Sequence, residues 1–204
     1  MLQVNNLECV RGDRSLFRGL NFSLEAGGVM QVQGANGSGK TSLLRMLCGL
    51  AAPAQGKIRW QGMDIRSLGG EYHKAITYLG HLSAVKDDLT AIENLRISSA
   101  LAGVEIDQGK ALEILQRMGL DGHEDLPAKA LSQGQRRRVA LARLLICGTL
   151  LWILDEPLTA LDGAAITLVQ TLLAEHLQQG GMVVLTTHQE INLAATTSQS
   201  LLLA

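Results

Sequence analysis

Residues 34–41 read Gly34-Ala35-Asn36-Gly37-Ser38-Gly39-Lys40-Thr41, and they match the phosphate-loop pattern G-x-x-x-x-G-K-[ST] at every defined position. The segment 29–33 before them is expected to be a strand, and the segment 42–47 after them a helix. In this context the helix directs unpaired N–H groups and its positive dipole end at a phosphate. The stretch therefore predicts a nucleotide site.

Two residues of this stretch are expected to contribute side-chain chemistry. Lys40 is expected to reach the β- and γ-phosphates as a point charge, and the Thr41 hydroxyl to be one ligand of Mg²⁺. The other loop residues and Ser42 are expected to surround the phosphates. A glycine-rich turn without a ligand is the alternative, but such a pattern arises by chance on the order of once in a hundred chains of this length.

The composition indicates a self-standing domain without a membrane span. The 204 residues suit one domain, or one domain with a subdomain. The hydrophobic fraction is 47% and the mean hydropathy +0.16, yet no uncharged apolar run approaches the length of a span. Residues 1–8 lack a basic region followed by an apolar run, so we expect no secretory signal and a cytosolic chain. The apolar excess indicates a surface for a partner.

Charge and cysteine content argue against other kinds of site. The formal net charge is −1 and the chain has only two Trp, two Tyr and two Phe, so no nucleic-acid partner is expected. Cys9, Cys48 and Cys147 are an odd number without a C-x-x-C pair, which favours neither a disulfide framework nor a zinc site. We therefore interpret the cysteines as buried free thiols.

Predicted strands alternate with predicted helices along the chain. Strands are expected at 2–9 (an edge strand), 20–24, 29–33, 57–60, 75–79, 150–154 and 182–186. Apolar positions recur at helical spacing from Thr90 to about Arg117, with a loop at 103–107, and indicate a helical insertion. A further helix is expected over 163–179. This alternation predicts an α/β fold with a parallel sheet and right-handed crossovers.

Two acidic residues, Asp155 and Glu156, end the apolar strand at 150–154. Ligands gather at the carboxyl ends of parallel strands, so Asp155 is expected beside the phosphate loop, where it can hold Mg²⁺ directly or through water. Glu156 could orient or activate the water that attacks the γ-phosphate. An acidic turn after a buried strand is the alternative, which Lys40 and Thr41 upstream disfavour.

The segment Leu131-Ser132-Gln133-Gly134-Gln135 resembles the L-S-G-G-Q signature of ABC-type ATPases. A capping box explains Ser132 and Gln135 without any ligand, because it is sufficient to begin a helix. It does not explain why the phosphate loop, this signature, the acid pair, Asp162 and His188 follow in the order that the family uses. The resemblance implies a P-loop NTPase fold of the ABC ATPase type over 1–204, with a mostly parallel core sheet, an antiparallel β subdomain and a helical subdomain at about 84–140.

The resemblance implies an Mg-dependent ATPase that acts as a head-to-tail homodimer. Ser132, Gly134 and Gln135, at a helix N-terminus, would face the γ-phosphate of the ATP held by the other subunit. Asp162 would communicate across the dimer, and His188 would contact the γ-phosphate and support the attacking water. Considered alone, a histidine after a strand is more often a surface or core residue.

Three positions depart from the family's pattern. Gln133 replaces a glycine of the signature and adds bulk near the phosphate-facing turn. His81 stands where the family usually has a Gln that senses Mg²⁺ and touches the membrane partner; because a protonated His loses its acceptor, pH-sensitive coupling is expected. The aromatic residue that stacks on adenine in the family is missing. Arg11 stands in its place, and either Arg11 or Phe17 is a candidate for that contact.

Within the family the chain resembles the ATP-binding subunits of cytochrome c maturation (haem exporter) complexes. The matching segments are 78–81, 89–95, 152–157 and 180–189. This resemblance implies a peripheral subunit on the cytoplasmic face of the inner membrane, with integral membrane partners, that uses ATP to release a haem-loaded chaperone. The chain has no C-x-x-C-H, so no direct haem site is expected. The alternatives are the ATPase of another short ABC importer or exporter, and a soluble ABC switch acting on nucleic acid or ribosomes.

Overall fold

The computed structural model describes residues 1–187, 191, 193 and 197–203. The chain divides into two compact units, which we call the sheet unit and the helical unit. The sheet unit comprises Met1–Gly80, Thr149–Glu156 and Leu173–Ala204, and the helical unit comprises His81–Gly148 and Pro157–Leu172. Each unit is described by itself below.

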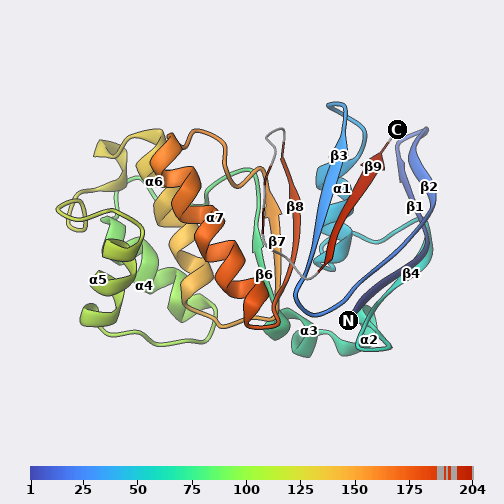
Figure 1. The fold of residues 1–204 in the computed structure, drawn as a ribbon, viewed down its shortest axis with the longest axis horizontal. Helices are drawn as coiled ribbons and strands as arrows, with labels where there is room; N and C mark the ends of the chain where they lie inside the picture. Colours follow the sequence, from blue (N-terminus) through green and yellow to red (C-terminus); the bar gives the residue numbers. More distant parts are fainter. Residues whose placement is uncertain (188–190, 192, 194–196, 204) are drawn as a thin grey trace. The chain divides into compact units, whose positions relative to one another are not determined.

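A five-stranded sheet in the order β6-β7-β8-β3-β9 forms the core of the sheet unit (Figure 1). All four neighbouring pairs are parallel. The strands are β3 (Gly28–Gly34), β6 (Ile76–Leu79), β7 (Leu151–Asp155), β8 (Met182–Thr186) and β9 (Thr197–Leu203). The expected mostly parallel α/β sheet is confirmed. The strand β9 was not expected, because its first half is polar and exposed and carries no apolar pattern.

A second sheet of the same unit is antiparallel and has the order β2-β1-β4-β5. Its strands are β1 (Leu2–Arg11), β2 (Arg14–Leu24), β4 (Gln55–Trp60) and β5 (Met63–Asp64). The expectation of an edge strand at 2–9 is wrong, since β1 is paired with β2 on one side and with β4 on the other. Alternation along a strand reports which face is buried, and it does not report how many neighbours the strand has.

The helix α1 (Lys40–Leu47) follows β3 and packs between the two sheets. Its buried residues include Leu43 and Leu47, which join one apolar cluster with Val4 of β1 and Ile153 of β7. Each fully buried Leu contributes roughly 1.5–3 kcal/mol. This packing holds the N-terminus of α1 in place. The short helices α2 (Ile65–Leu68) and α3 (Gly70–Ala75) follow β5.

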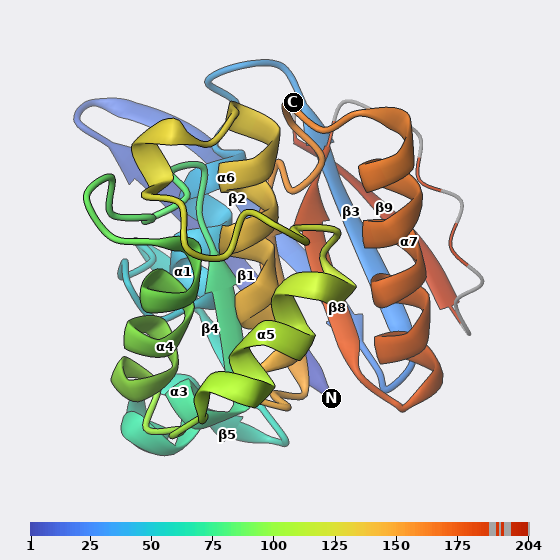
Figure 2. The ribbon, with the colours of Figure 1, turned by 90° about the vertical axis from the view of Figure 1, so that its left-hand side faces the viewer.

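Two short helices and a signature helix build most of the helical unit. Figure 2 shows α4 (Ala91–Leu101) and α5 (Gln108–Arg117), with the loop between them at the expected position. The remaining elements are η1 (Ala128–Ala130), α6 (Gln133–Leu141) and η2 (Ala142–Leu145). The helix α7 (Gly163–Gln178) begins in this unit and ends in the sheet unit. Among the described residues, no helix is long and apolar enough to cross a bilayer.

Candidate functional site

The loop between β3 and α1 has a backbone that requires glycine. Gly34, Gly37 and Gly39 have φ angles of 149°, 83° and 103°. Residues that carry a Cβ rarely adopt positive φ angles of this kind, whereas glycine does so readily. A Cβ at Gly34 would also lie 2.5 Å from the carbonyl oxygen of Leu203. The loop can therefore wrap closely around an anion only with these residues.

Two side chains in this loop are suited to a phosphate group. The Nζ of Lys40 donates to the carbonyl oxygens of Gly34 (2.7 Å) and Ala35 (3.2 Å), so its charge lies over the loop. The Oγ of Ser38 is buried and has no hydrogen-bond partner among the described residues. A buried hydroxyl without a partner is rare and calls for an external one. Asn36, at the tip of the loop, is exposed.

The structure brings Thr41 and Asp155 together. The Thr41 hydroxyl donates to Oδ2 of Asp155 at 2.8 Å, and the Thr186 hydroxyl donates to Oδ1 at 2.7 Å. Asp155 is only 3% exposed, so both carboxylate oxygens are held in one orientation. A hydroxyl and a carboxylate next to a phosphate site are the oxygen donors that Mg²⁺ prefers, and the residues present fit that ion.

Glu156 follows β7 with a left-handed backbone, at a φ of 51°. Its N–H donates to the Thr186 hydroxyl at 2.9 Å. Strained residues of this kind cost about 1–3 kcal/mol and cluster at functional sites. The positive φ and the hydrogen bond to Thr186 fix the backbone of Glu156 directly after Asp155.

Sequence reasoning missed two residues of this site. Thr186 ends β8 and bonds to both acids, as described above. Tyr78 lies on β6 beside β7; burial, the nearby Cys48 and then the charge of Asp155 raise the pKa of its hydroxyl, against an opposing effect of Arg45. The phenol therefore stays protonated. A polar residue at the end of an apolar strand was the available signal for Thr186.

The signature residues lie in the helical unit, at the N-terminus of α6. The Ser132 hydroxyl accepts from the N–H of Gln135 at 3.2 Å, and the Gln135 side chain accepts from the N–H of Ser132 at 2.8 Å. The capping box is thus confirmed. Gly134 packs closely, since a Cβ there would lie 2.8 Å from the carbonyl oxygen of Ala160. Ser132 and Gln133 are exposed.

Of three further predicted residues, two belong to the helical unit and one lies outside the described residues. Asp162 accepts from the N–H of Ala165 at 2.8 Å at the start of α7. His81 is exposed, and its carbonyl oxygen accepts from Arg137 at 3.5 Å. His188 lies outside the residues that the structure describes. The sheet unit therefore contains the phosphate loop and both acids, whereas the helical unit contains Ser132, Asp162 and His81.

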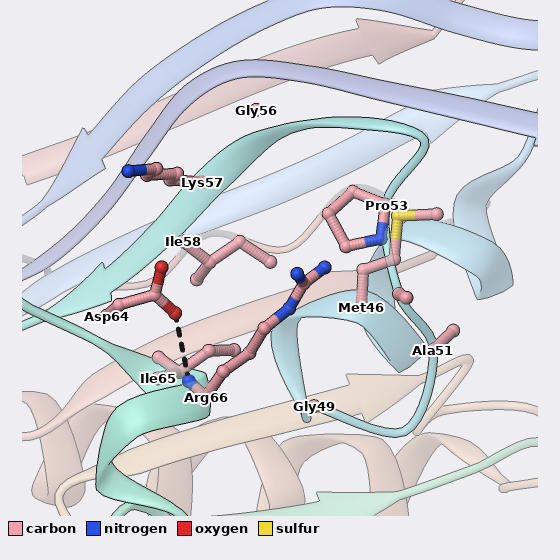
Figure 3. A pocket seen from close by; sticks show the side chains of 11 residues that line it. Met46, Gly49, Ala51, Pro53, Gly56, Lys57, Ile58, Asp64, Ile65 and Arg66 are labelled. Carbon is pink, nitrogen blue, oxygen red and sulfur yellow. Dashed lines mark hydrogen bonds between the residues drawn. The ribbon is translucent and has the colours of Figure 1, made fainter.

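A pocket of about 150 Å³ lies elsewhere in the sheet unit, at the far end of α1 (Figure 3). Its lining includes Met46, Gly49, Asp64 and Arg66. The eight residues of α1 span about 12 Å. The pocket is therefore separated from the loop before Lys40 and is not the phosphate site.

A glycine-rich loop leads into α1, and a carboxylate held by two hydroxyls ends a strand of the same sheet. This arrangement is characteristic of P-loop nucleotide hydrolases. The capped signature segment at Ser132 places this hydrolase in the ABC class, as the comparison with known families confirms: residues 17–159 match the ABC transporter family. The chain is an Mg-dependent ATPase of that class.

Curated relatives define the family more closely. The cytochrome c biogenesis ATP-binding export protein CcmA of Nitrosospira multiformis is 71% identical over 196 residues, covering 96% of this chain and 95% of the relative. The CcmA protein of Nitrosomonas europaea is 60% identical over 204 residues, covering 100% of this chain and 96% of the relative. The chain belongs to the family of cytochrome c biogenesis ATP-binding export proteins.

Solved structures agree with this fold. A putative ABC transporter ATP-binding protein from Pyrococcus furiosus has a TM-score of 0.84 and 25% identity, covering 98% of this chain and 96% of that one. A bacterial ABC transporter cassette solved as a dimer has a TM-score of 0.81 and 23% identity, covering 93% of this chain and 88% of that one. The expected ABC ATPase fold is therefore confirmed.

Proposed function

We propose that this chain is the ATP-hydrolysing subunit of a membrane export complex that serves cytochrome c biogenesis. The observation that carries the proposal is the 71% identity to a cytochrome c biogenesis export protein over nearly the whole of both chains. In this proposal the chain lies peripherally on the cytoplasmic side of the inner membrane. Integral membrane subunits handle haem, and hydrolysis drives release of the haem-loaded chaperone.

The site residues are assigned roles from their geometry. The loop N–H groups and Lys40 hold the β- and γ-phosphates, and Thr41 and Asp155 hold Mg²⁺, which when bound neutralises charge on the phosphate oxygens. Glu156 takes a proton from the attacking water, and the hydrogen bond from its N–H to Thr186 holds its backbone in place for that role. Proton transfer to a positioned base contributes typically 10²–10⁴-fold to a rate.

The nucleotide site is proposed to be completed by a second copy of the chain. The exposed, capped N-terminus of α6 offers Ser132 and Gly134 to the γ-phosphate held by the other copy. His188 is assigned to the γ-phosphate of its own subunit, and Asp162 to the dimer interface. His81, which is exposed, is assigned to contact with the membrane subunits.

A Glu156→Gln variant tests the catalytic assignment and the cellular role together. ATP binding should persist, while turnover should fall at least about 100-fold because the base is lost. Production of c-type cytochromes should stop. Glu71→Gln, on the exposed ion pair with Lys74, is the matched control and should change neither. Normal cytochrome yield in the Glu156 variant would contradict the proposed coupling.

Purification of the complex from detergent-solubilised membranes separates the alternatives. Recovery of haem-handling membrane proteins with the tagged chain supports the proposal. Recovery of unrelated transporter subunits favours the ATPase of another short ABC importer or exporter. Recovery of ribosomes or nucleic acid favours a soluble switch, which the net charge of −1 disfavours.

A further inference from the structure

Three consecutive arginines of α6 make three different kinds of contact. Arg136 forms a salt bridge with Asp87 at 2.8 Å, with both side chains partly open to solvent, and such pairs contribute little to stability. Arg138 donates to the carbonyl oxygen of Met118 at 3.0 Å, directly after the end of α5. Arg137, between them, is buried and only 6% exposed. An arginine is almost never buried to this extent without partners for its charge.

Arg137 donates to two backbone carbonyls of the helical unit. Its Nε is 3.4 Å from the carbonyl oxygen of Pro157, and its Nη1 is 3.5 Å from the carbonyl oxygen of His81. All three residues belong to that unit. A guanidinium is planar and carries several donors in fixed directions, so one group can hold two acceptors at once. The Arg137 side chain therefore joins two segments that are far apart in the sequence.

Both segments begin where the chain leaves the parallel sheet. His81 comes two residues after Leu79, the end of β6, and Pro157 comes two residues after Asp155, the end of β7. The strands β6 and β7 are parallel neighbours, and Leu79 is paired with Leu154. The two segments therefore leave the sheet from adjacent strand ends, and one guanidinium donates to the first residue of each beyond the sheet unit.

The backbone of Glu156 is held on both sides. Its own N–H donates to the Thr186 hydroxyl at 2.9 Å. The carbonyl of the next residue, Pro157, accepts from Arg137. Between these two points Glu156 has a φ of 51°, and strained conformations of this kind persist only where the surrounding structure holds them. Arg137 is therefore one of two side chains that maintain the backbone conformation of Glu156.

We propose that Arg137 is a positioning residue for ATP hydrolysis, which holds the Pro157 carbonyl and thereby keeps the Glu156 carboxylate in place for the attacking water. This inference rests on the proposed function, in which Glu156 is the base. The helix α6 that carries Arg137 is capped by Ser132, which is assigned to the γ-phosphate bound by the other copy. One helix thus carries both the contact to the second copy and the side chain that positions the base.

Steady-state ATP hydrolysis and equilibrium binding of Mg-ATP by the full chain test this inference. Arg137→Met keeps an apolar stem and removes every donor, so kcat should fall roughly 10- to 100-fold. The dissociation constant of Mg-ATP should stay within about twofold, because Lys40 and Thr41 are unchanged. Arg138→Met is the matched control: it removes the hydrogen bond to the end of α5, so it should lower the melting temperature and leave kcat unchanged.

The same substitution in a Glu156→Gln background shows whether Arg137 acts through Glu156. In single-turnover measurements Arg137→Met should lower the residual rate there by less than about threefold, because the carboxylate that it positions is already absent. A loss in that background as large as in the unmodified chain would show that Arg137 does not act through Glu156, and would overturn the proposal.

An unchanged kcat in a folded Arg137→Met variant would overturn it as well. If that variant does not fold, Arg137→Lys decides, because it keeps the buried charge and replaces the two donating nitrogens with one. Its kcat should also fall, and full activity would contradict the positioning role. Full turnover in Glu156→Gln alone would instead contradict the base assigned in the proposed function, whatever the effect of Arg137.

Discussion

The Thr186 hydroxyl connects the two acids of the site: it donates to Asp155 and accepts from the backbone N–H of Glu156. Thr186 is fully buried, so its hydroxyl cannot exchange these partners for water. The Thr41 hydroxyl satisfies the other oxygen of Asp155. The orientation of the carboxylate is therefore determined by two hydroxyls from different elements.

A Thr186→Val variant keeps the shape of the side chain and removes both hydrogen bonds. We expect kcat to fall by roughly 10- to 100-fold, as for outer residues that orient a metal ligand, with a smaller change in KM for ATP. Thr186→Ser should rescue the rate. Thr77→Val is the control, because it removes a buried hydroxyl bonded to Thr149 at the opposite end of the strands. Thr77→Val should lower the free energy of unfolding by about 1–3 kcal/mol and leave kcat unchanged. An unchanged kcat in Thr186→Val would contradict the orienting role of Thr186.

At the scale of elements, an aromatic stack ties α7 to β7. The rings of Trp152 and His176 lie 3.8 Å apart between centroids and are nearly parallel, at 5°. The His176 ring nitrogen Nε2 is 3.3 Å from the carbonyl oxygen of Met182 at the start of β8. Gly181 lies against the same ring, since a Cβ there would be 2.3 Å from it. The C-terminal end of α7 thus packs against β7, the strand that leads into Asp155 and Glu156.

This stack makes stability depend on pH. Burial lowers the pKa of His176, against hydrogen bonds to the Met182 and Leu150 carbonyls that raise it. An unfolded His has a pKa of about 6.5. As the pH falls below that value, the His176 side chain becomes protonated in the unfolded state before it does in the folded state. The stabilisation by neutral His176 is present above about pH 6.5 and is lost as the pH falls through the folded pKa.

Urea unfolding at a series of pH values checks this expectation. His176→Phe keeps a ring for the stack and removes the proton site, so its stability should fall less than that of the unmodified chain between about pH 7 and about pH 5. Parallel pH profiles for the unmodified chain and His176→Phe would show that His176 does not titrate on unfolding.

At the scale of the whole molecule, the residues assigned to one nucleotide belong to two units. Lys40 and Glu156 lie in the sheet unit, and Ser132 lies in the helical unit. In the proposed head-to-tail dimer, ATP bound to one copy joins it to the helical unit of the other. Dimerisation should therefore require bound nucleotide and should be reversed by hydrolysis.

Sedimentation of Glu156→Gln with Mg-ATP should show a dimer, because the bound ATP is not consumed, and without nucleotide it should show a monomer. Adding Ser132→Arg should abolish the dimer, because it places a positive charge and a long side chain at the positive end of α6. Ser67→Arg, at an exposed position of α2, is the control and should still dimerise. A monomer at saturating Mg-ATP in Glu156→Gln would rule out the nucleotide-dependent dimer.

The sequence by itself determined the features that depend on neighbouring residues. The glycines and Lys40 of the phosphate loop, the capping box at Ser132 and the strand 182–186 are each encoded within a few positions, because caps, turns and side-chain periods act locally. The order of the motifs along the chain was sufficient to indicate the ABC class.

Only the tertiary structure decided what depends on distant segments. It placed β1 between β2 and β4, added β9 to the parallel sheet, and brought Thr186 to Asp155 across 31 positions of the chain. It also laid Phe17 against Gly39. Strand pairing and the packing of α1 bring together segments that are far apart in the sequence. The local pattern of each segment does not specify which distant segment it contacts, so these contacts are visible only in the folded chain.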